Sequence, residues 1–273
     1  MLRPANLPHF SYAPLQPIFA SQRPYINPYL AQNFWTRHVR RVQSSSAAQG
    51  AYLRSVRSKK ALVWLCIGTN CIVWLSWQAS RREGGTSKQA AKIRKLGLDL
   101  QKNFLLATRN VREGRWWVLI TSAFSHISFW HLFVNMFTFQ QLSQVLVYTP
   151  GLTASRHLAP LIFGSALAGS AAFLSHESAS SRSQRVGLGF SGVVSGVVTS
   201  AACLMPHQQM LLFGVVPLPL WALAIGYIAY DTYAMDGDTS VAHDAHVGGA
   251  IFGGAFYMLA LKRFGGILGP RMR

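Results

Sequence analysis

The amino-acid sequence predicts an all-α membrane protein in which six transmembrane helices form one bundle. Hydrophobic residues make up 50% of the 273 residues and charged residues only 12%, whereas a soluble domain carries about 25% charged residues. Apolar runs of nearly the length that crosses a bilayer also recur along the chain. These observations favour a polytopic membrane protein over a soluble class.

The six predicted spans follow one another without an internal repeat or a second domain. The first is expected at residues 61–79, and a long polar connection at 80–125 follows it. Trp116 and Trp117 within this connection favour contact with the bilayer surface, because tryptophan prefers the membrane–water boundary. The remaining spans are expected at residues 126–148, 157–174, 187–204, 210–230 and 242–261.

The N-terminal residues 1–60 form a basic arm, and the first acidic residue of the chain is Glu83. The arm is rich in arginine and contains consecutive serines at 44–46, a composition typical of a mitochondrial transit peptide. We therefore predict a transit peptide and a multi-pass protein of the mitochondrial inner membrane. The alternatives are an ordinary basic tail and another cellular membrane. Residues 61–262 would then form the transmembrane domain and residues 263–273 a short basic tail.

The charge pattern bears on partners and on orientation. The formal net charge is +18, but no recognisable nucleic-acid motif accompanies the basic residues, so no nucleic-acid partner is expected. The connection between the fifth and sixth spans contains three aspartates, among them Asp231, which favours termini on the positive, inner side. The basic first connection favours the opposite orientation.

Cys66, Cys71 and Cys203 all fall in apolar segments, so neither a disulfide framework nor a metal or cofactor site is expected.

A serine and a histidine lie beside glycines in two of the predicted spans. Ser191 precedes a small-xxx-small pattern in the fourth span, which lets another helix approach closely. His246 shares a helical face with two glycines of the sixth span. Packing of these faces would bring Ser191 within hydrogen-bonding distance of His246, as a base must be to activate a serine. The alternative is a serine bonded to its own helix backbone. The glycines are Gly189, Gly192 and Gly196 around the serine, and Gly249 and Gly253 after the histidine.

The second span contributes a further polar face. His131 and Asn135 are spaced i, i+4 and therefore share one side of a helix, and His126 precedes them by one to two turns. Two polar side chains facing a common interior could donate hydrogen bonds to a developing oxyanion. The alternative is an ordinary polar contact between helices.

Taken together, these motifs resemble the rhomboid family of intramembrane serine proteases. The resemblance covers about residues 61–261 and follows the six-helix order of the family. The spacing of His243 and His246 before the double glycine is similar to the mitochondrial, presenilin-associated rhomboid-like branch. The matching motifs are Phe124-Ser125-His126, His131-Leu132-Phe133-Val134-Asn135-Met136, Gly189-Phe190-Ser191-Gly192, and Ala245-His246-Val247-Gly248-Gly249 with Gly253.

The resemblance implies a function for each of these residues. Ser191 would be the nucleophile and His246 the general base, acting as a dyad without a carboxylate. The backbone N–H of Ser191, together with His131 and Asn135, would form the oxyanion hole. Asp244 lies two residues from His246 and points to another side of the helix, so no triad is expected. The substrates would be transmembrane segments of other proteins within the lipid bilayer.

The chain departs from the family pattern at two positions. Trp117 is not followed by the arginine that bacterial members often carry. Ser195 stands where many members have an aromatic ring that packs on the catalytic histidine, so the orientation of His246 must depend on other contacts.

In the fifth span, Pro217 and Pro219 weaken helical hydrogen bonding, and we expect this span to bend and to gate substrate entry.

Other classes of protein fit the sequence less well. An α/β-hydrolase needs G-x-S-x-G, but Val193 occupies the last position. A metalloprotease would need H-E-x-x-H, and neither an inverted repeat nor a ring of charges indicates a transporter or a channel. The alternative that stays open is a catalytically inactive rhomboid-like protein that binds client membrane proteins, although such proteins lack the catalytic residues retained here.

Overall fold

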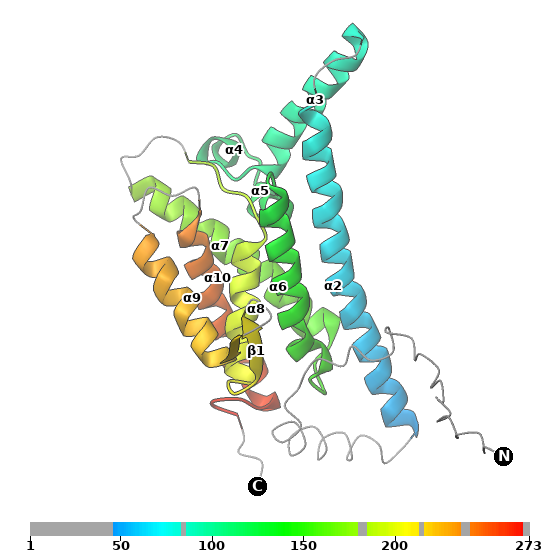
Figure 1. The fold of residues 1–273 in the computed structure, drawn as a ribbon, viewed down its shortest axis with the longest axis vertical. Helices are drawn as coiled ribbons and strands as arrows, with labels where there is room; N and C mark the ends of the chain where they lie inside the picture. The colour runs from blue at the N-terminus through cyan, green and yellow to red at the C-terminus, as the bar shows by residue number, and fades with distance from the viewer. Residues whose placement is uncertain (1–45, 83–85, 180–184, 213–215, 236–240, 270–273) are drawn as a thin grey trace, which may run out of the picture.

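The structure is a computed structural model that describes residues 46–82, 86–179, 185–212, 216–235 and 241–269. Residues 1–45 of the predicted basic arm lie outside the described residues. Figure 1 shows the long helices side by side in one bundle, with one further helix projecting beyond the end of the bundle.

Each of the six predicted spans corresponds to a helix of this bundle. These helices are α2 (Ser46–Ser80), α6 (Phe129–Tyr148), α7 (Ala159–Ala179), α8 (Ser191–Leu204), α9 (Leu220–Ala234) and α10 (His243–Phe256). Helix α8 packs against α6, α7, α9 and α10, and α2 packs on the outside of α6. By length and hydropathy, two helical segments of the described residues could cross a membrane, Ala47–Ser80 and Ala154–Ser178. The helical bundle is therefore observed, and the crossing by all six helices stays a prediction.

Helix α2 begins at Ser46, earlier than the start predicted near residue 61, so the predicted arm at 1–60 includes the first turns of this helix. Lys59 anchors this basic segment to α6, because it is fully buried and donates to the carbonyls of Leu146 and Thr149, at 3.3 and 3.1 Å. These carbonyls lie at the C-terminal end of α6, where carbonyls lack helical partners and positive charge is favourable.

The predicted fifth span is the region where the all-α expectation is wrong. Residues at its start form an antiparallel hairpin, β1 (Gln209–Leu212) and β2 (Val216–Pro219), in which Met210 pairs with Leu218. Helix α9 begins only after β2, because proline lacks a backbone N–H and disfavours helical conformation in the residue before it. Pro217 and Pro219 therefore lie in β2, before the helix, and do not bend α9 as expected. The gating of substrate entry by this span stays a prediction.

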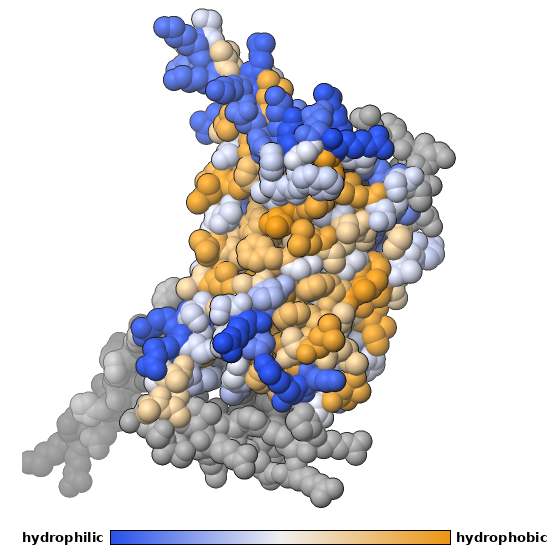
Figure 2. All heavy atoms as spheres, turned by 180° about the vertical axis from the view of Figure 1, so that it is seen from behind, coloured by the Kyte–Doolittle hydropathy of each residue, from blue (hydrophilic) through white to orange (hydrophobic). Residues whose placement is uncertain are grey.

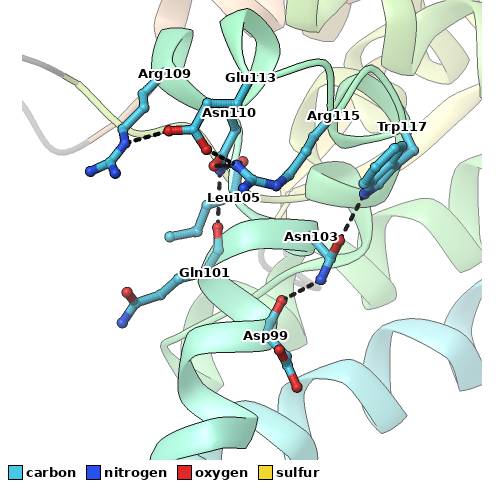
Figure 3. A network of polar contacts seen from close by, with 9 residues as sticks. All are labelled: Asp99, Gln101, Asn103, Leu105, Arg109, Asn110, Glu113, Arg115 and Trp117. Carbon is cyan, nitrogen blue, oxygen red and sulfur yellow. Dashed lines mark hydrogen bonds and ion pairs between the residues drawn. The ribbon is translucent and has the colours of Figure 1, made fainter.

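The predicted polar connection at 80–125 is mostly helical and carries a network of polar contacts at one end of the bundle. It contains α3 (Ser87–Phe104), α4 (Thr108–Arg112), α5 (Val118–Thr121) and the single turn η1 (Ser122–Phe124). Figure 3 shows Asn110 at the centre of the network, donating to the carbonyls of Gln101 and Leu105 at 3.0 Å each. Arg115 donates to the side chain of Asn110, and Trp117 donates to Asn103. These contacts hold α4 and the start of α5 against the end of α3.

Apolar side chains form a broad belt around the middle of the bundle. Figure 2 shows this belt between a polar end that includes α3 and a second polar region at the opposite end. Exposed members come from several helices: Leu65, Ile72, Phe133, Phe137, Ile225 and Ile251. Soluble proteins rarely expose apolar surface of this extent, and a belt between polar ends is the surface that a bilayer requires.

We predict that Lys59→Met destabilises the protein, because it leaves the Leu146 and Thr149 carbonyls without their buried donor at a cost of about 1–3 kcal/mol. The expected result is a Tm lower by several degrees in detergent. Arg57→Met removes an exposed positive charge from the neighbouring part of the helix and should leave the Tm unchanged. Equal Tm values for the two variants would contradict the capping function of Lys59.

Candidate active site

Ser191 is the first residue of α8 and follows a tight turn. Gly189 has a φ of +126°, in the left-handed region that favours glycine, and a Cβ there would lie 2.7 Å from Cε1 of His131. Phe190 precedes the helix with its ring fully buried against two other phenylalanine rings. The turn and the buried ring together fix the direction in which the side chain of Ser191 points.

His126 supports the same turn. It is the first residue of the predicted second span, but it lies before the observed helix α6, which begins at Phe129. Its Nε2 accepts a hydrogen bond from the backbone N–H of Phe190 at 3.3 Å, and its buried ring lies edge-on to His131 with centroids 4.9 Å apart. His126 therefore contacts both the turn before the serine and the histidine on α6.

The backbones of α8 and α10 approach each other closely at their glycines. A Cβ on Gly249 would lie 1.9 Å from the carbonyl oxygen of Gly192, and a Cβ on Gly253 would lie 2.2 Å from that of Gly196. Any larger residue at these positions would force the helices apart. The sequence predicted this packing from the glycine spacing alone.

His246 lies between Ser191 and a buried carboxylate. Its Nε2 is 2.7 Å from Ser191 Oγ, and its Nδ1 is 2.9 Å from Oδ1 of Asp231 on α9. The same carboxylate oxygen is 2.7 Å from Nδ1 of His243, and the side chains of Asp231 and His243 are both buried. The geometry thus departs from the expected dyad, because a carboxylate contacts the histidine on the side away from the serine.

Sequence reasoning missed Asp231 because it placed this residue in the connection after the fifth span. The hairpin takes up the start of that span, so α9 begins later and continues to Ala234, with Asp231 in its last turns. A signal was present: an aspartate at the end of one apolar helix precedes two histidines at the start of the next, at positions 243 and 246.

Asp244 belongs to a different group of contacts, as its position two residues from His246 predicts. Its Oδ2 accepts hydrogen bonds from Arg185 at 2.8 Å and from Nδ1 of His176 at 3.0 Å, and its Oδ1 accepts from the backbone N–H of Ala245. Its negative charge in the first turn of α10 also interacts favourably with the positive end of the helix dipole.

Helix α6 places the two predicted oxyanion donors beside the serine. His131 and Asn135 line the same cavity as Ser191 and His246. The side-chain amide of Asn135 donates one hydrogen bond back to the carbonyl of His131 at 2.8 Å. An amide nitrogen carries two hydrogens, so a second one remains for a ligand.

The cavity around these residues has a volume of about 220 Å³ and lies between α6, α8, α9 and α10. Apart from the polar groups already described, most of its lining is apolar, including Val134, Val198, Ala224 and Ile228. A water molecule occupies about 30 Å³ in the liquid, so the cavity can hold several waters or a side chain. Several polar side chains therefore converge in an otherwise apolar space.

The group formed by Asp231, His243 and His246 also has the composition of a metal site. Its ligand atoms all lie within 4.8 Å of one another. The contacts of both imidazoles with one carboxylate oxygen, at 2.7 and 2.9 Å, have the length of hydrogen bonds. We therefore treat the three side chains as a hydrogen-bonded group.

Comparison with known proteins identifies the family. The sequence model of the family described as Rhomboid domain matches residues 113–263, more than half of the chain, and the protein therefore belongs to the rhomboid family. It is 31% identical over 199 residues to "Rhomboid protein 1, mitochondrial" of Saccharomyces cerevisiae, covering 71% of this chain and 51% of that protein. It is 29% identical over 170 residues to "RHOMBOID-like protein 12, mitochondrial" of Arabidopsis thaliana, covering 55% and 48%. The chain spans about half the length of these curated relatives.

We predict that Gly249→Ala slows the reaction of Ser191 with a fluorophosphonate, a reagent that labels activated serines. The added methyl group would meet the Gly192 carbonyl and separate α8 from α10, and a displacement of about 1 Å between reacting groups can cost about a hundred-fold in rate. The measurement is the labelling rate of purified protein in liposomes.

Gly68→Ala is the matched control for this prediction. A Cβ at Gly68 on α2 has nothing within 4 Å, so the labelling rate should equal that of the wild type. Wild-type rates in both variants would show that close packing of the two glycine faces is not required.

Proposed function

We propose that the protein is an intramembrane serine endopeptidase that cleaves transmembrane segments of membrane proteins, with Ser191 as nucleophile and His246 as general base. The observation that carries this proposal is the 2.7 Å contact between Ser191 Oγ and His246 Nε2 in a cavity among apolar helices. Membership of the rhomboid family supports it, since members of this family are generally serine proteases that act on transmembrane substrates.

The proposed reaction proceeds through an acyl-enzyme. Ser191 Oγ attacks the scissile carbonyl while Nε2 of His246 takes the hydroxyl proton and then transfers it to the leaving amine. Water in the cavity hydrolyses the resulting ester, with His246 again acting as the base. The volume of about 220 Å³ leaves room for this water beside the substrate carbonyl.

Three donors are available to the oxyanion that forms during attack. Ser191 is the first residue of α8, and the N–H groups of a first helical turn lack helical partners and attract negative charge. We propose that the N–H of Ser191 acts with His131 and with the second amide hydrogen of Asn135. These groups come from two helices that are already in contact, so little reorganisation is needed during the reaction.

We propose the mitochondrial inner membrane as the location. The names of both relatives contain the word mitochondrial, and residues 1–60 are rich in arginine without an acidic residue, as in transit peptides. The apolar belt and the two long apolar helical segments support a membrane location.

The second candidate function is that of an inactive rhomboid-like protein that holds client membrane proteins. The same cavity would then bind an unwound client segment without cleaving it. The close contact between Ser191 and His246 favours the protease, because a binding protein has no need for a base at 2.7 Å from a hydroxyl.

Fluorophosphonate labelling of the purified protein in liposomes distinguishes the two candidates. For a protease, we expect labelling of the wild type that is abolished in Ser191→Ala and strongly reduced in His246→Ala, because the serine needs its base. A folded wild-type protein that is not labelled in liposomes would instead support the client-binding function.

We predict that Asn135→Ala keeps partial activity. Removing one oxyanion donor costs about a hundred-fold to a thousand-fold in the turnover of a serine protease, because the remaining donors still act, whereas Ser191→Ala removes the nucleophile. Cleavage of a fluorogenic peptide by the two variants is the measurement. Turnover in Asn135→Ala equal to that of the wild type would exclude this residue from the oxyanion hole.

A further inference from the structure

The carboxylate of Asp231 is shared by two imidazoles in a buried position. Asp231 lies on α9 and is only 5% exposed, while His243 and His246 lie one turn apart on α10. Both Nδ1 atoms contact Oδ1 of this aspartate, at 2.7 and 2.9 Å. Burial of a carboxylate is unfavourable unless partners compensate for it, and these two imidazoles compensate for it here.

The contact decides which nitrogen of His246 carries the proton. A carboxylate accepts hydrogen bonds and does not donate them, so Nδ1 of His246 must donate to Asp231. In the neutral ring the proton is then on Nδ1, and the lone pair of Nε2 points towards Ser191 Oγ, which is 2.7 Å away. This is the tautomer that a general base needs.

The position of Ser195 makes this support necessary. The residue one turn after Ser191 on α8 is Ser195, which has no aromatic ring to pack on His246. Ser195 instead lines the cavity together with His246. Without the carboxylate, the imidazole could rotate or adopt the other tautomer, and neither state would accept the proton of Ser191.

We propose that Asp231 is a positioning residue that completes a Ser191–His246–Asp231 triad, with the carboxylate supplied by the neighbouring helix α9. Its negative charge also stabilises the imidazolium of His246 that forms when Ser191 attacks. This inference rests on the proposed function, because it assigns a partner to the same catalytic base.

His243 holds the carboxylate in place. It is 3% exposed, it donates to the same oxygen of Asp231, and its ring lies edge-on to Tyr230 of α9 and to His246, with centroids 5.6 and 5.9 Å apart. The second imidazole therefore limits rotation of the aspartate side chain. His243 is connected to Ser191 through Asp231 and His246, so its effect on the reaction is indirect.

The test measures the concentration dependence of fluorophosphonate labelling in liposomes for the wild type and Asp231→Asn. We expect the maximal labelling rate to fall about a hundred-fold to ten-thousand-fold, with the half-saturating concentration within about twofold of the wild type. The upper limit is the loss of about ten-thousand-fold in turnover that the same change causes in a soluble serine protease, where asparagine holds the histidine in the wrong tautomer. A maximal rate within about threefold of the wild type, in a folded variant, would overturn the proposal.

Asp244→Asn is the matched control, because Asp244 is a buried carboxylate on α10 that contacts Arg185 and His176 rather than the serine–histidine pair. Its labelling rate should stay within a few fold of the wild type even where its Tm falls. Equal losses of rate in Asp231→Asn and Asp244→Asn, in proportion to their losses of Tm, would assign Asp231 a purely structural function and overturn the proposal.

A rescue experiment decides the question if Asp231→Asn does not fold. Asp231→Ala removes the side chain, and formate can supply a carboxylate through the cavity that Asp231 lines. An increase of about tenfold or more in the labelling rate with formate, and none with chloride at equal ionic strength, supports the proposal; no increase with formate contradicts it. Absence of Ser191-dependent labelling in the wild type would instead refute the proposed function itself.

Discussion

The close approach of α8 and α10 is the constraint on which the rest of the site depends. Small residues at a helix interface let the two backbones approach closely, and the van der Waals contacts formed in this way stabilise the packing. The carbonyls of Gly192 and Gly196 lie so close to Gly249 and Gly253 that a Cβ at either of these two glycines would overlap them. Ser200 adds a hydrogen bond from its hydroxyl to the Gly253 carbonyl at 2.8 Å. This fixed interface sets the distance between the serine and the histidine.

Polar contacts at helix ends hold together the elements around this interface. Lys59 satisfies carbonyls at the C-terminal end of α6, and Asp244 interacts with the N-terminal end of α10 while binding Arg185. At the end of the bundle that carries α3, Asn110 bonds to two backbone carbonyls of the first connection. Each contact satisfies groups that would otherwise be left without partners, and each lies away from the cavity. Ser191 and His246 can therefore face the cavity while the helices that carry them are fixed.

The sequence was sufficient for the parts of the site that depend on local spacing. Glycines at i+3 and i+7 from His246 define a helical face whatever the partner is, and the same is true of His131 and Asn135 at i, i+4. The start of α2 and the position of Asp231 could not be derived in this way. The first depends on carbonyls of α6 that accept from Lys59, and the second on the hairpin that delays α9. Both are consequences of contacts between segments far apart in the sequence.

The distribution of charge in the site follows from its apolar surroundings. An unpaired ionisable group inside a bundle of apolar helices is costly, and such groups are retained where they act. Asp231 is acceptable there because two imidazoles donate to it, and His246 is acceptable because it has a partner on each side. In a medium of low dielectric these contacts are stronger than in water, and the loss of any one is also more costly. The contacts that stabilise the buried carboxylate are therefore the same ones that direct Nε2 of His246, the proposed general base, towards Ser191.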